Sequence, residues 1–372
     1  MYREIREWRP QILHRRWRND YNPRPRFLEP TQQSLPPGVS ALPVLERCVA
    51  EAETRFGGLT LAGVPDATRP WIRRGIGIAA GMKNLGYSFG FPEQSTAIVE
   101  IRGRGEAENA VVRVGAADVG QGSHLALRQI ASEVLGLPLD RIEMITDDSS
   151  QAPNAGSASA SRLTLMAGRA VHDAAAKALE NYRASDDERV EATVQFRPAA
   201  TTMLSEDDGS GIPNYCYGYA AQAVEVEVDT LTGQVRVTRV ISVHDVGRAV
   251  NMQQVEGQIE GCLAQAVGYA LLEELKTREG IILTPHLSTY LLPTALDMPE
   301  EIVPVVLELA DPHGPFGARG VAEMPLVPFL PAVASAIHDA IGVWLTEQPF
   351  TPERVLAALA NDQSSTGKRA PA

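Results

Sequence analysis

The sequence predicts an α+β fold made of α/β subdomains, each of which combines a β-sheet with helices. In the first half, alternating apolar residues predict strands at 95–101 and 110–115. In the second half, a longer alternating pair at 220–229 and 234–243 predicts a hairpin with one buried face. Amphipathic helices follow short glycine or serine turns in the first half, and a further helix follows the hairpin in the second.

Changes in composition predict five segments. They are a basic arm at 1–35, a first subdomain at 36–183, a polar connecting excursion at 184–213, a second subdomain at 214–360, and a flexible tail at 361–372. The arm is rich in arginine, with Trp8 and Trp17 interleaved. This pattern favours docking on an acidic partner or on the chain's own acidic body, with RNA binding as the alternative.

The overall composition limits the classes of function. A net charge of −12 on 372 residues argues against a nucleic-acid partner. Neither a membrane-spanning apolar run nor a secretory signal is evident, so we expect a cytoplasmic protein without a membrane partner. The three cysteines, Cys48, Cys216 and Cys262, form no CxxC pair. This spacing argues against a cysteine-built iron–sulfur or zinc site on this chain and fits a reducing compartment.

The first predicted elements are a helix at 44–56 and a strand at 74–80, RGIGIAA. The strand contains a G-x-G-x-x-A match, but no strand precedes the match and no helix follows it. We therefore reject a dinucleotide fingerprint at this position.

Residues 118–124, DVGQGSH, form a glycine turn that opens a helix ending near residue 135. A strand–turn–helix of this kind can cradle an anion, and Gln121 adds an amide that donates and accepts hydrogen bonds. An ordinary strand-to-helix connection would look similar.

A second turn, GSASASR at 156–162, follows a strand at 141–145 and opens a helix at 163–182. Its small residues would expose backbone donors beside hydroxyl groups, although a simple N-cap serine is the plainer interpretation. Two such turns together favour a shared, phosphate-rich ligand.

In the second half, a helix at 252–275 carries Gln258 among glycines that we expect to pack closely against another backbone. A strand at 303–309 leads into GPFGARGVAEMP at 314–325, and a helix at 328–341 follows. Glu323 lies between small and apolar residues in this loop. Such neighbours would partly desolvate the carboxylate and raise its pKa toward that of a working base; a solvated loop carboxylate is the alternative.

Four motifs occur in the order found in one family: DVGQGSH, SASASR, GQIEG at 257–261, and GARGVAE at 317–323. The chain resembles the C-terminal half of the molybdenum-binding subunit of the xanthine dehydrogenase/aldehyde oxidase family of molybdenum hydroxylases. The resemblance covers about residues 36–360 and implies that family's molybdopterin-binding fold, with two related sheet-plus-helix subdomains.

The resemblance also implies roles for individual residues. The cofactor would be a molybdenum-bearing molybdopterin, in bacteria usually its cytosine dinucleotide form, and no protein side chain would ligate the metal. Glu323 matches the family's catalytic glutamate, and Phe89 matches a phenylalanine that stacks on aromatic substrates. The cofactor-binding residues implied are Gly120, Gln121, Gly122, Ser159, Ala160, Ser161 and Gln258.

The implied activity is hydroxylation of an aldehyde or an N-heterocycle such as a purine, with water as the oxygen source. Electrons would pass to iron–sulfur and FAD subunits, since this chain shows no motif for either group. A further expected partner is a chain carrying the N-terminal half of the molybdenum subunit. Two alternatives stay open here: a truncated, non-catalytic assembly subunit that keeps the fold, and a generic nucleotide-binding α/β module. Departures from the family pattern include Ala322, where a glycine is common.

Overall fold

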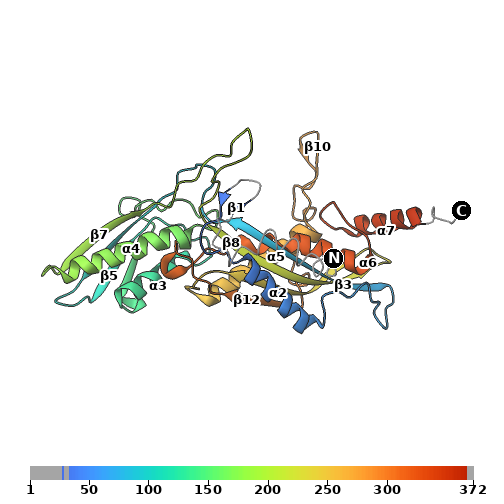
Figure 1. Ribbon diagram of the computed structural model, residues 1–372, viewed down its shortest axis with the longest axis horizontal. Helices are drawn as coiled ribbons and strands as arrows, with labels where there is room; N and C mark the ends of the chain where they lie inside the picture. Colours follow the sequence, from blue (N-terminus) through green and yellow to red (C-terminus); the bar gives the residue numbers. More distant parts are fainter. Residues whose placement is uncertain (1–26, 29–32, 367–372) are drawn as a thin grey trace.

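The computed structural model describes residues 27–28 and 33–366 (Figure 1). The predictions for most of the 1–35 arm, and for residues 367–372 of the tail, lie outside these residues. Two four-stranded sheets with attached helices form the body of the protein, which confirms the predicted α+β fold.

The first sheet has the strand order β6-β5-β4-β7. Its strands are β4 (Ser95–Arg102), β5 (Asn109–Arg113), β6 (Ile142–Ile145) and β7 (Arg189–Phe196). Helices α3 (Ser123–Leu135) and α4 (Leu163–Arg183) pack against it and against each other. Helix α4 buries an alanine-rich stripe that includes Ala167, Ala170, Ala174 and Ala178. These small residues repeat at helical spacing, so the helix can lie close to the strands.

The second sheet has the strand order β12-β9-β8-β3. Its strands are β3 (Ile72–Asn84), β8 (Tyr217–Asp229), β9 (Val235–Asp245) and β12 (Glu301–Leu307). Helix α2 (Ala41–Phe56) covers one face, and α5 (Met252–Leu271) and α6 (Phe329–Ile341) cover the other. Along β8, Ala221 and Ala223 pack toward α2, whereas Val224 and Val226 pack toward α5 and α6. Both faces of β8 are buried, so the prediction of a single buried face for this hairpin is wrong. Helices on both sides of the sheet explain the nearly continuous apolar run of this strand.

The glycines of the G-x-G-x-x-A match have a packing role. A Cβ on Gly75 would lie 2.2 Å from the carbonyl oxygen of Ala336, and one on Gly77 would lie 2.0 Å from that of Ala332. Both carbonyls belong to α6, so the helix backbone rests directly on β3. The segment is a strand, as predicted, and its glycines serve this close approach.

The sheets do not follow the predicted segment boundaries in two places. Strand β3, predicted to belong to the first subdomain, pairs with β8 in the second sheet. Strand β7, within the predicted polar excursion, pairs with β4 as an edge of the first sheet. Alternation along a strand indicates which face is buried but not which strand is its neighbour.

Two predictions on helices also need correction. Helix α5 ends at Leu271 rather than at residue 275. No described atom lies within 4 Å of a Cβ built on Gly257 or on Gly261, so these two glycines face open space instead of another backbone. Gly268, by contrast, is closely packed, with a built Cβ 2.8 Å from Pro293.

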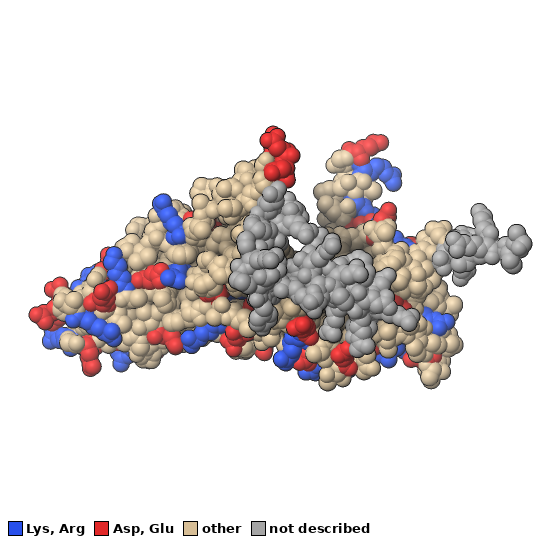
Figure 2. Space-filling model, viewed as in Figure 1, with Lys and Arg blue, Asp and Glu red and all other residues tan. Residues whose placement is uncertain are grey.

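The remaining elements are short or peripheral. They are β1 (Phe27–Leu28), β2 (Gln33–Ser34), β10 (Thr277–Arg278), β11 (Ile281–Ile282), α7 (Pro352–Thr366) and the 3-10 helices η3 (Leu139–Arg141), η4 (Pro315–Gly317) and η5 (Met324–Leu326). Helix α7 thus continues into the predicted tail. The segment Met324–Ile341 is long and apolar enough to cross a membrane, but it includes α6, which packs against β3 and β8 as a core helix. On the face shown in Figure 2, acidic and basic side chains are interspersed.

Candidate functional site

A cavity of about 280 Å³ lies where loops of the two sheets meet. Its walls come from the turn before α3, the turn before α4, the start of α5, and residues 319–323. Six of the residues predicted for the site line it: Gln121, Gly122, Ser159, Ser161, Gln258 and Glu323. Segments far apart in sequence therefore converge on one cavity. Gly120 and Ala160 belong to the same turns but are not among its lining residues.

The turn before α3 is stabilised by its own side chains. The Asp118 carboxylate accepts hydrogen bonds from the backbone N–H groups of Gly120, Gly122 and His124, at 2.9, 3.2 and 3.1 Å. Burial alone would raise the pKa of Asp118, but these bonds outweigh it and hold that pKa below its ordinary value. The expected backbone anion cradle is therefore largely occupied by Asp118.

Gln121 is also tied into this turn. Its Oε1 accepts from the backbone N–H of Val119 at 2.7 Å, and its Nε2 donates to the carbonyl oxygen of Ala117 at 3.0 Å. Nε2 also donates to Ser123 Oγ at 3.3 Å, so the capacity that remains is the second acceptor site of Oε1. Gln121 both shapes the turn and lines the cavity.

The turn before α4 is strained and firmly anchored. Ala160 and Ser161 have φ values of 52° and 51°, in the left-handed region that costs non-glycine residues about 1–3 kcal/mol each. Arg162, whose side chain is fully buried, donates to the carbonyl oxygens of Ala155 and Ser157 at 2.6 and 3.2 Å. It also pairs with the buried carboxylate of Glu93. Arg162 therefore fixes the whole turn from within.

Glu323 lies beside this strained turn. Its Oε2 accepts from Ser161 Oγ at 2.9 Å and pairs with Lys83 Nζ at 2.7 Å. Its side chain is 52% exposed. Burial acts to raise the pKa of Glu323, but the hydrogen bond and charge of Lys83, with the bond from Ser161, outweigh it and lower that pKa. The predicted upward shift is wrong, because the sequence neighbours of Glu323 do not include Lys83.

The start of α5 adds polar residues that the sequence did not single out. The Asn251 side chain caps the helix by accepting from the backbone N–H of Gln254 at 3.1 Å. Asn251, Gln254 and Arg248 all line the cavity with Gln258. The positive end of the α5 dipole at this wall favours an anionic ligand. An N-cap asparagine before a helix was the available signal in the sequence.

Phe89 lies apart from these residues. It is 50% exposed, has a φ of 56°, and its backbone N–H donates to the carbonyl oxygen of Pro213 at 2.9 Å. It is not among the residues that line the cavity. The structure therefore does not bring this predicted substrate residue to the same site.

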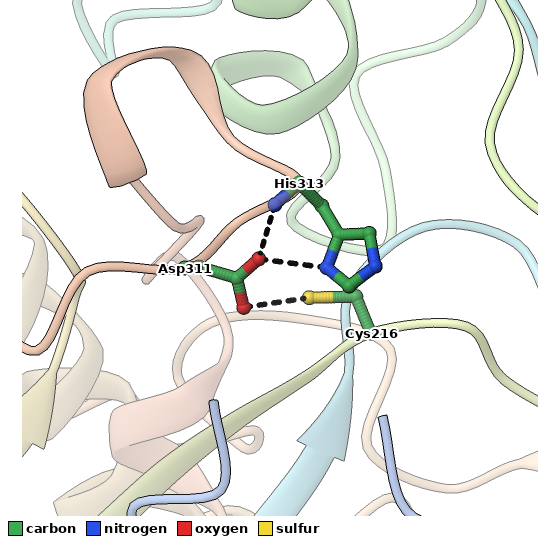
Figure 3. A group of neighbouring side chains, drawn as sticks. All are labelled: Cys216, Asp311 and His313. Carbon is green, nitrogen blue, oxygen red and sulfur yellow. Dashed lines mark hydrogen bonds and ion pairs between the residues drawn. The ribbon is translucent and has the colours of Figure 1, made fainter. Parts of the chain in front are cut away.

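Cys216, Asp311 and His313 form a cluster (Figure 3), and its Asp311 bonds Arg319 of the cavity lining. One Asp311 oxygen accepts from the backbone N–H of His313 and bonds its Nδ1, both at 2.8 Å. The other accepts from Arg319 Nε at 2.9 Å and from the Cys216 thiol at 3.6 Å. Burial raises the pKa of the Cys216 thiol far above its ordinary value, so the sulfur remains protonated. These contacts describe a hydrogen-bonded anchor in which the Asp311 oxygens are occupied by donors.

The anchor holds the loop that carries Glu323. The buried Arg319 donates to Asp311 and, through Nη1, to Asp245 at 2.7 Å and to Ser40 at 3.2 Å. Gly320, the next residue, lies so close to the other turn that a Cβ would sit 1.9 Å from the Ser161 carbonyl oxygen. Arg319 therefore presses the Glu323 loop against the Ser161 turn at the cavity wall.

Comparison with known proteins defines the class to which this site belongs. Residues 61–196 and 182–299 match the family model of the molybdopterin cofactor-binding domain. The matched region contains both glycine and serine turns and Gln258. The chain belongs to the molybdopterin cofactor-binding domain family, and the family resemblance inferred from its four motifs is confirmed.

Particular relatives are named as a xanthine dehydrogenase subunit or as aldehyde oxidoreductases. The chain is 29% identical over 321 residues to a probable xanthine dehydrogenase subunit of Bacillus subtilis, a match covering 78% of this chain and 42% of the relative. It is 30% identical over 366 residues to the aldehyde oxidoreductase of Megalodesulfovibrio gigas, covering 93% and 38%. The aldehyde oxidoreductase structure from Desulfovibrio desulfuricans superposes with a TM-score of 0.73 and 28% identity, covering 88% of this chain and 36% of that one. The chain therefore spans about two fifths of the length of these relatives.

Proposed function

We propose that this chain is the cofactor-binding part of a molybdenum hydroxylase that oxidises an aldehyde or an N-heterocycle such as a purine, with water as the oxygen source. The observation that carries the proposal is the position of Glu323. Its carboxylate shares one cavity with both predicted cofactor turns and is bonded to Ser161 of the second turn.

The residues present fit a pterin cofactor with phosphate groups. Gly122 has a φ of 81°, in the left-handed region that favours glycine, and it lies against the Gln254 side chain at the cavity wall. The α5 N-terminus and Arg248 favour anionic groups, and the amides of Gln121, Gln254 and Gln258 can pair with a heterocycle. We infer that the cofactor is molybdopterin in its cytosine dinucleotide form. The residues proposed to hold it are Gly120, Gln121, Gly122, Ser159, Ala160, Ser161 and Gln258, with Arg248, Asn251 and Gln254 added by the geometry.

The cofactor, when bound, supplies the redox capacity for hydroxylation. The chain's own contribution is a proton acceptor next to the reacting substrate. Lys83 and Ser161 hold Oε2 of Glu323, which leaves Oε1 to take the proton that water releases as its oxygen is transferred. The lowered pKa of Glu323 keeps the carboxylate ionised, and thus able to accept that proton, at neutral pH.

The electrons released would leave through iron–sulfur and FAD partners. The three cysteines of the chain are buried and separate, which supports placing these centres on other chains or domains. The name of the Bacillus subtilis relative also describes it as a subunit. Three free cysteines further support a reducing, cytoplasmic location.

Replacement of Glu323 by glutamine tests this function. Glutamine keeps the shape and an acceptor atom but cannot take the proton, and loss of a general base typically costs ~10²–10⁴ in rate. The assembled Glu323→Gln enzyme should retain molybdenum and its circular dichroism spectrum, yet turn over at least a hundredfold more slowly. The wild-type rate should fall at acidic pH as Glu323 protonates. The residual rate of the variant should not show this fall.

Glu188→Gln is the matched control, since Glu188 is likewise an exposed, ion-paired glutamate, 2.8 Å from Arg104 and away from the cavity. It should leave turnover and cofactor content unchanged. A Glu323→Gln enzyme with turnover close to that of the control would remove the general base from the proposal.

A further inference from the structure

An exposed apolar arm projects from the end of α5. The arm, residues 272–300, contains the short β10–β11 pair and otherwise runs without regular structure. Figure 1 shows its β10 hairpin standing away from the body of the protein. Eight leucine and isoleucine side chains on the arm are between 44% and 91% exposed: Leu275, Ile281, Ile282, Leu283, Leu287, Leu291, Leu292 and Leu296.

The polar side chains of the arm make the contacts that hold it together. Tyr290 Oη donates to Glu273 Oε2 at 2.8 Å, and Thr284 Oγ1 donates to the Glu274 carbonyl oxygen at 3.3 Å. Glu274 in turn pairs with Arg354 of α7 at 2.8 Å. The arm is therefore fixed by polar contacts while its leucines face outward, the reverse of the usual arrangement in a soluble loop.

The exposed face of α5 continues this surface. Gly257 and Gly261 have open space above their Cα atoms, and Tyr269 on the same helix is 44% exposed. At the end of the helix, Gly268 packs against Pro293 of the arm. One surface thus runs from the cavity wall at Gln258, along the glycine face of α5, and onto the arm.

A surface of this composition marks an interface. Single exposed leucines are normal, but monomeric proteins rarely expose large contiguous apolar patches. Glycines on an exposed helix face cost helix stability without a packing benefit, unless another backbone approaches them closely.

The relatives indicate which partner would cover it. This chain corresponds to 36–42% of the length of the three compared relatives, so each carries more than half of its length outside the matched part. In those proteins the matched part and the remainder belong to one chain. The remainder must therefore lie against some surface of the part represented here.

We propose that the 272–300 arm and the glycine face of α5 are the docking surface for the part of the molybdenum subunit that this chain does not span. The occupant is the same whether it is supplied by a separate chain or by further sequence on this one. The inference rests on the proposed function for the identity of the partner. The glycine face would let a segment of that partner approach α5 next to the cavity, and the leucines of the arm would lie in apolar pockets of the partner.

The test needs the rest of the molybdenum subunit from the same source, expressed as a separate tagged chain. Its sequence is identified by its match to the part of aldehyde oxidoreductase that the present chain does not span. Titration calorimetry would measure its affinity for the wild-type chain and for a Leu287→Asp/Leu291→Asp/Leu296→Asp variant. The variant should bind at least tenfold more weakly while keeping the wild-type thermal midpoint, because the replaced side chains are exposed. Hydrogen exchange of arm peptides should slow when the wild-type chain is in the complex.

A Val64→Asp/Leu231→Asp variant is the matched control, since both side chains are more than half exposed but lie on turns outside the surface. It should bind as the wild type does. Binding of the arm variant within twofold of this control, or unchanged arm exchange in the complex, would overturn the proposal. A wild-type homodimer that the arm variant disrupts would assign the surface to a second copy instead. If deletion of residues 1–26 speeds hydrogen exchange in the 272–300 arm, the surface would be assigned to the chain's own N-terminal segment.

These measurements need neither cofactor nor turnover. A complex that forms through the arm but contains no pterin would retain the docking surface and reject the proposed function. A pterin-loaded, active assembly in which the 272–300 arm stays exposed would retain the proposed function and reject the docking surface.

Discussion

Replacing Glu93 with glutamine would leave the guanidinium of Arg162 buried without its counter-charge. The two side chains are 6% and 0% exposed, and Arg162 Nε lies 2.9 Å from Glu93 Oε1. Removing one partner of such a buried pair typically costs about 3–5 kcal/mol in unfolding free energy. Since glutamine keeps one acceptor and the Arg162 bonds to backbone carbonyls persist, we expect about 3 kcal/mol for Glu93→Gln.

Urea unfolding followed by circular dichroism would measure this loss, with the midpoint moving at an unchanged slope. The double variant Glu93→Gln/Arg162→Met should be more stable than the sum of the single effects predicts, because it removes the uncompensated charge. Arg104→Met is the surface control: Arg104 and Glu188 are 81% and 65% exposed, and such pairs are worth at most about 1 kcal/mol. If Glu93→Gln cost no more than that control, Arg162 would not be the internal anchor of the strained turn.

The remaining predictions concern the cavity wall. Lys83→Met should raise the pKa of Glu323, because burial then acts without the opposing charge of Lys83, so the acid limb of the pH–rate profile should move to higher pH. Lys83→Arg keeps the charge and should retain the wild-type limb. An acid limb that does not move in Lys83→Met would contradict the pairing of Lys83 with Glu323. Gln121→Ala should lower pterin content and cost about 1 kcal/mol of stability through its lost turn hydrogen bonds, measured by released pterin fluorescence and thermal unfolding. Gln151→Ala, which alters another turn amide, is its control, and full pterin occupancy in Gln121→Ala would exclude Gln121 from the cofactor site.

The features that the sequence predicted well are those encoded by residues close together in the chain. Periodicity and glycine turns predicted α3 and α4 with their preceding turns, and the β8–β9 hairpin, because each depends on local spacing. Both turns open a helix and line one cavity. Strand pairing is different: β3 lies next to β8, although residues 85–216 separate them in the chain.

The electrostatics of the site could not be predicted for the same reason. The sequence neighbours of Glu323 are apolar and predict a raised pKa, whereas Lys83, at the far end of β3, lowers it. Arg162 and Arg319 gave no signal, since an isolated arginine in a loop is ordinary. Their carboxylate partners include Glu93 and Asp245, which lie far from them in the chain. Charge on a side chain is visible in a sequence, but its counter-charge is set by the fold.

The glycines of α5 and β3 illustrate how the same residue type acquires opposite roles. Gly75 and Gly77 match part of a nucleotide motif, and they instead let α6 rest on the sheet. Gly257 and Gly261 predicted an equally close backbone contact, yet described neighbours leave them open. A helix that retains glycine on an exposed face sacrifices propensity of about 1 kcal/mol at each position. That cost is compensated when a second backbone packs against the glycines. The exposed leucines of the 272–300 arm begin where α5 ends, so a partner that packs against the glycines would also reach them. The described residues supply no second backbone at Gly257 or Gly261, and the docking surface proposed above would place against them the part of the molybdenum subunit that this chain does not span.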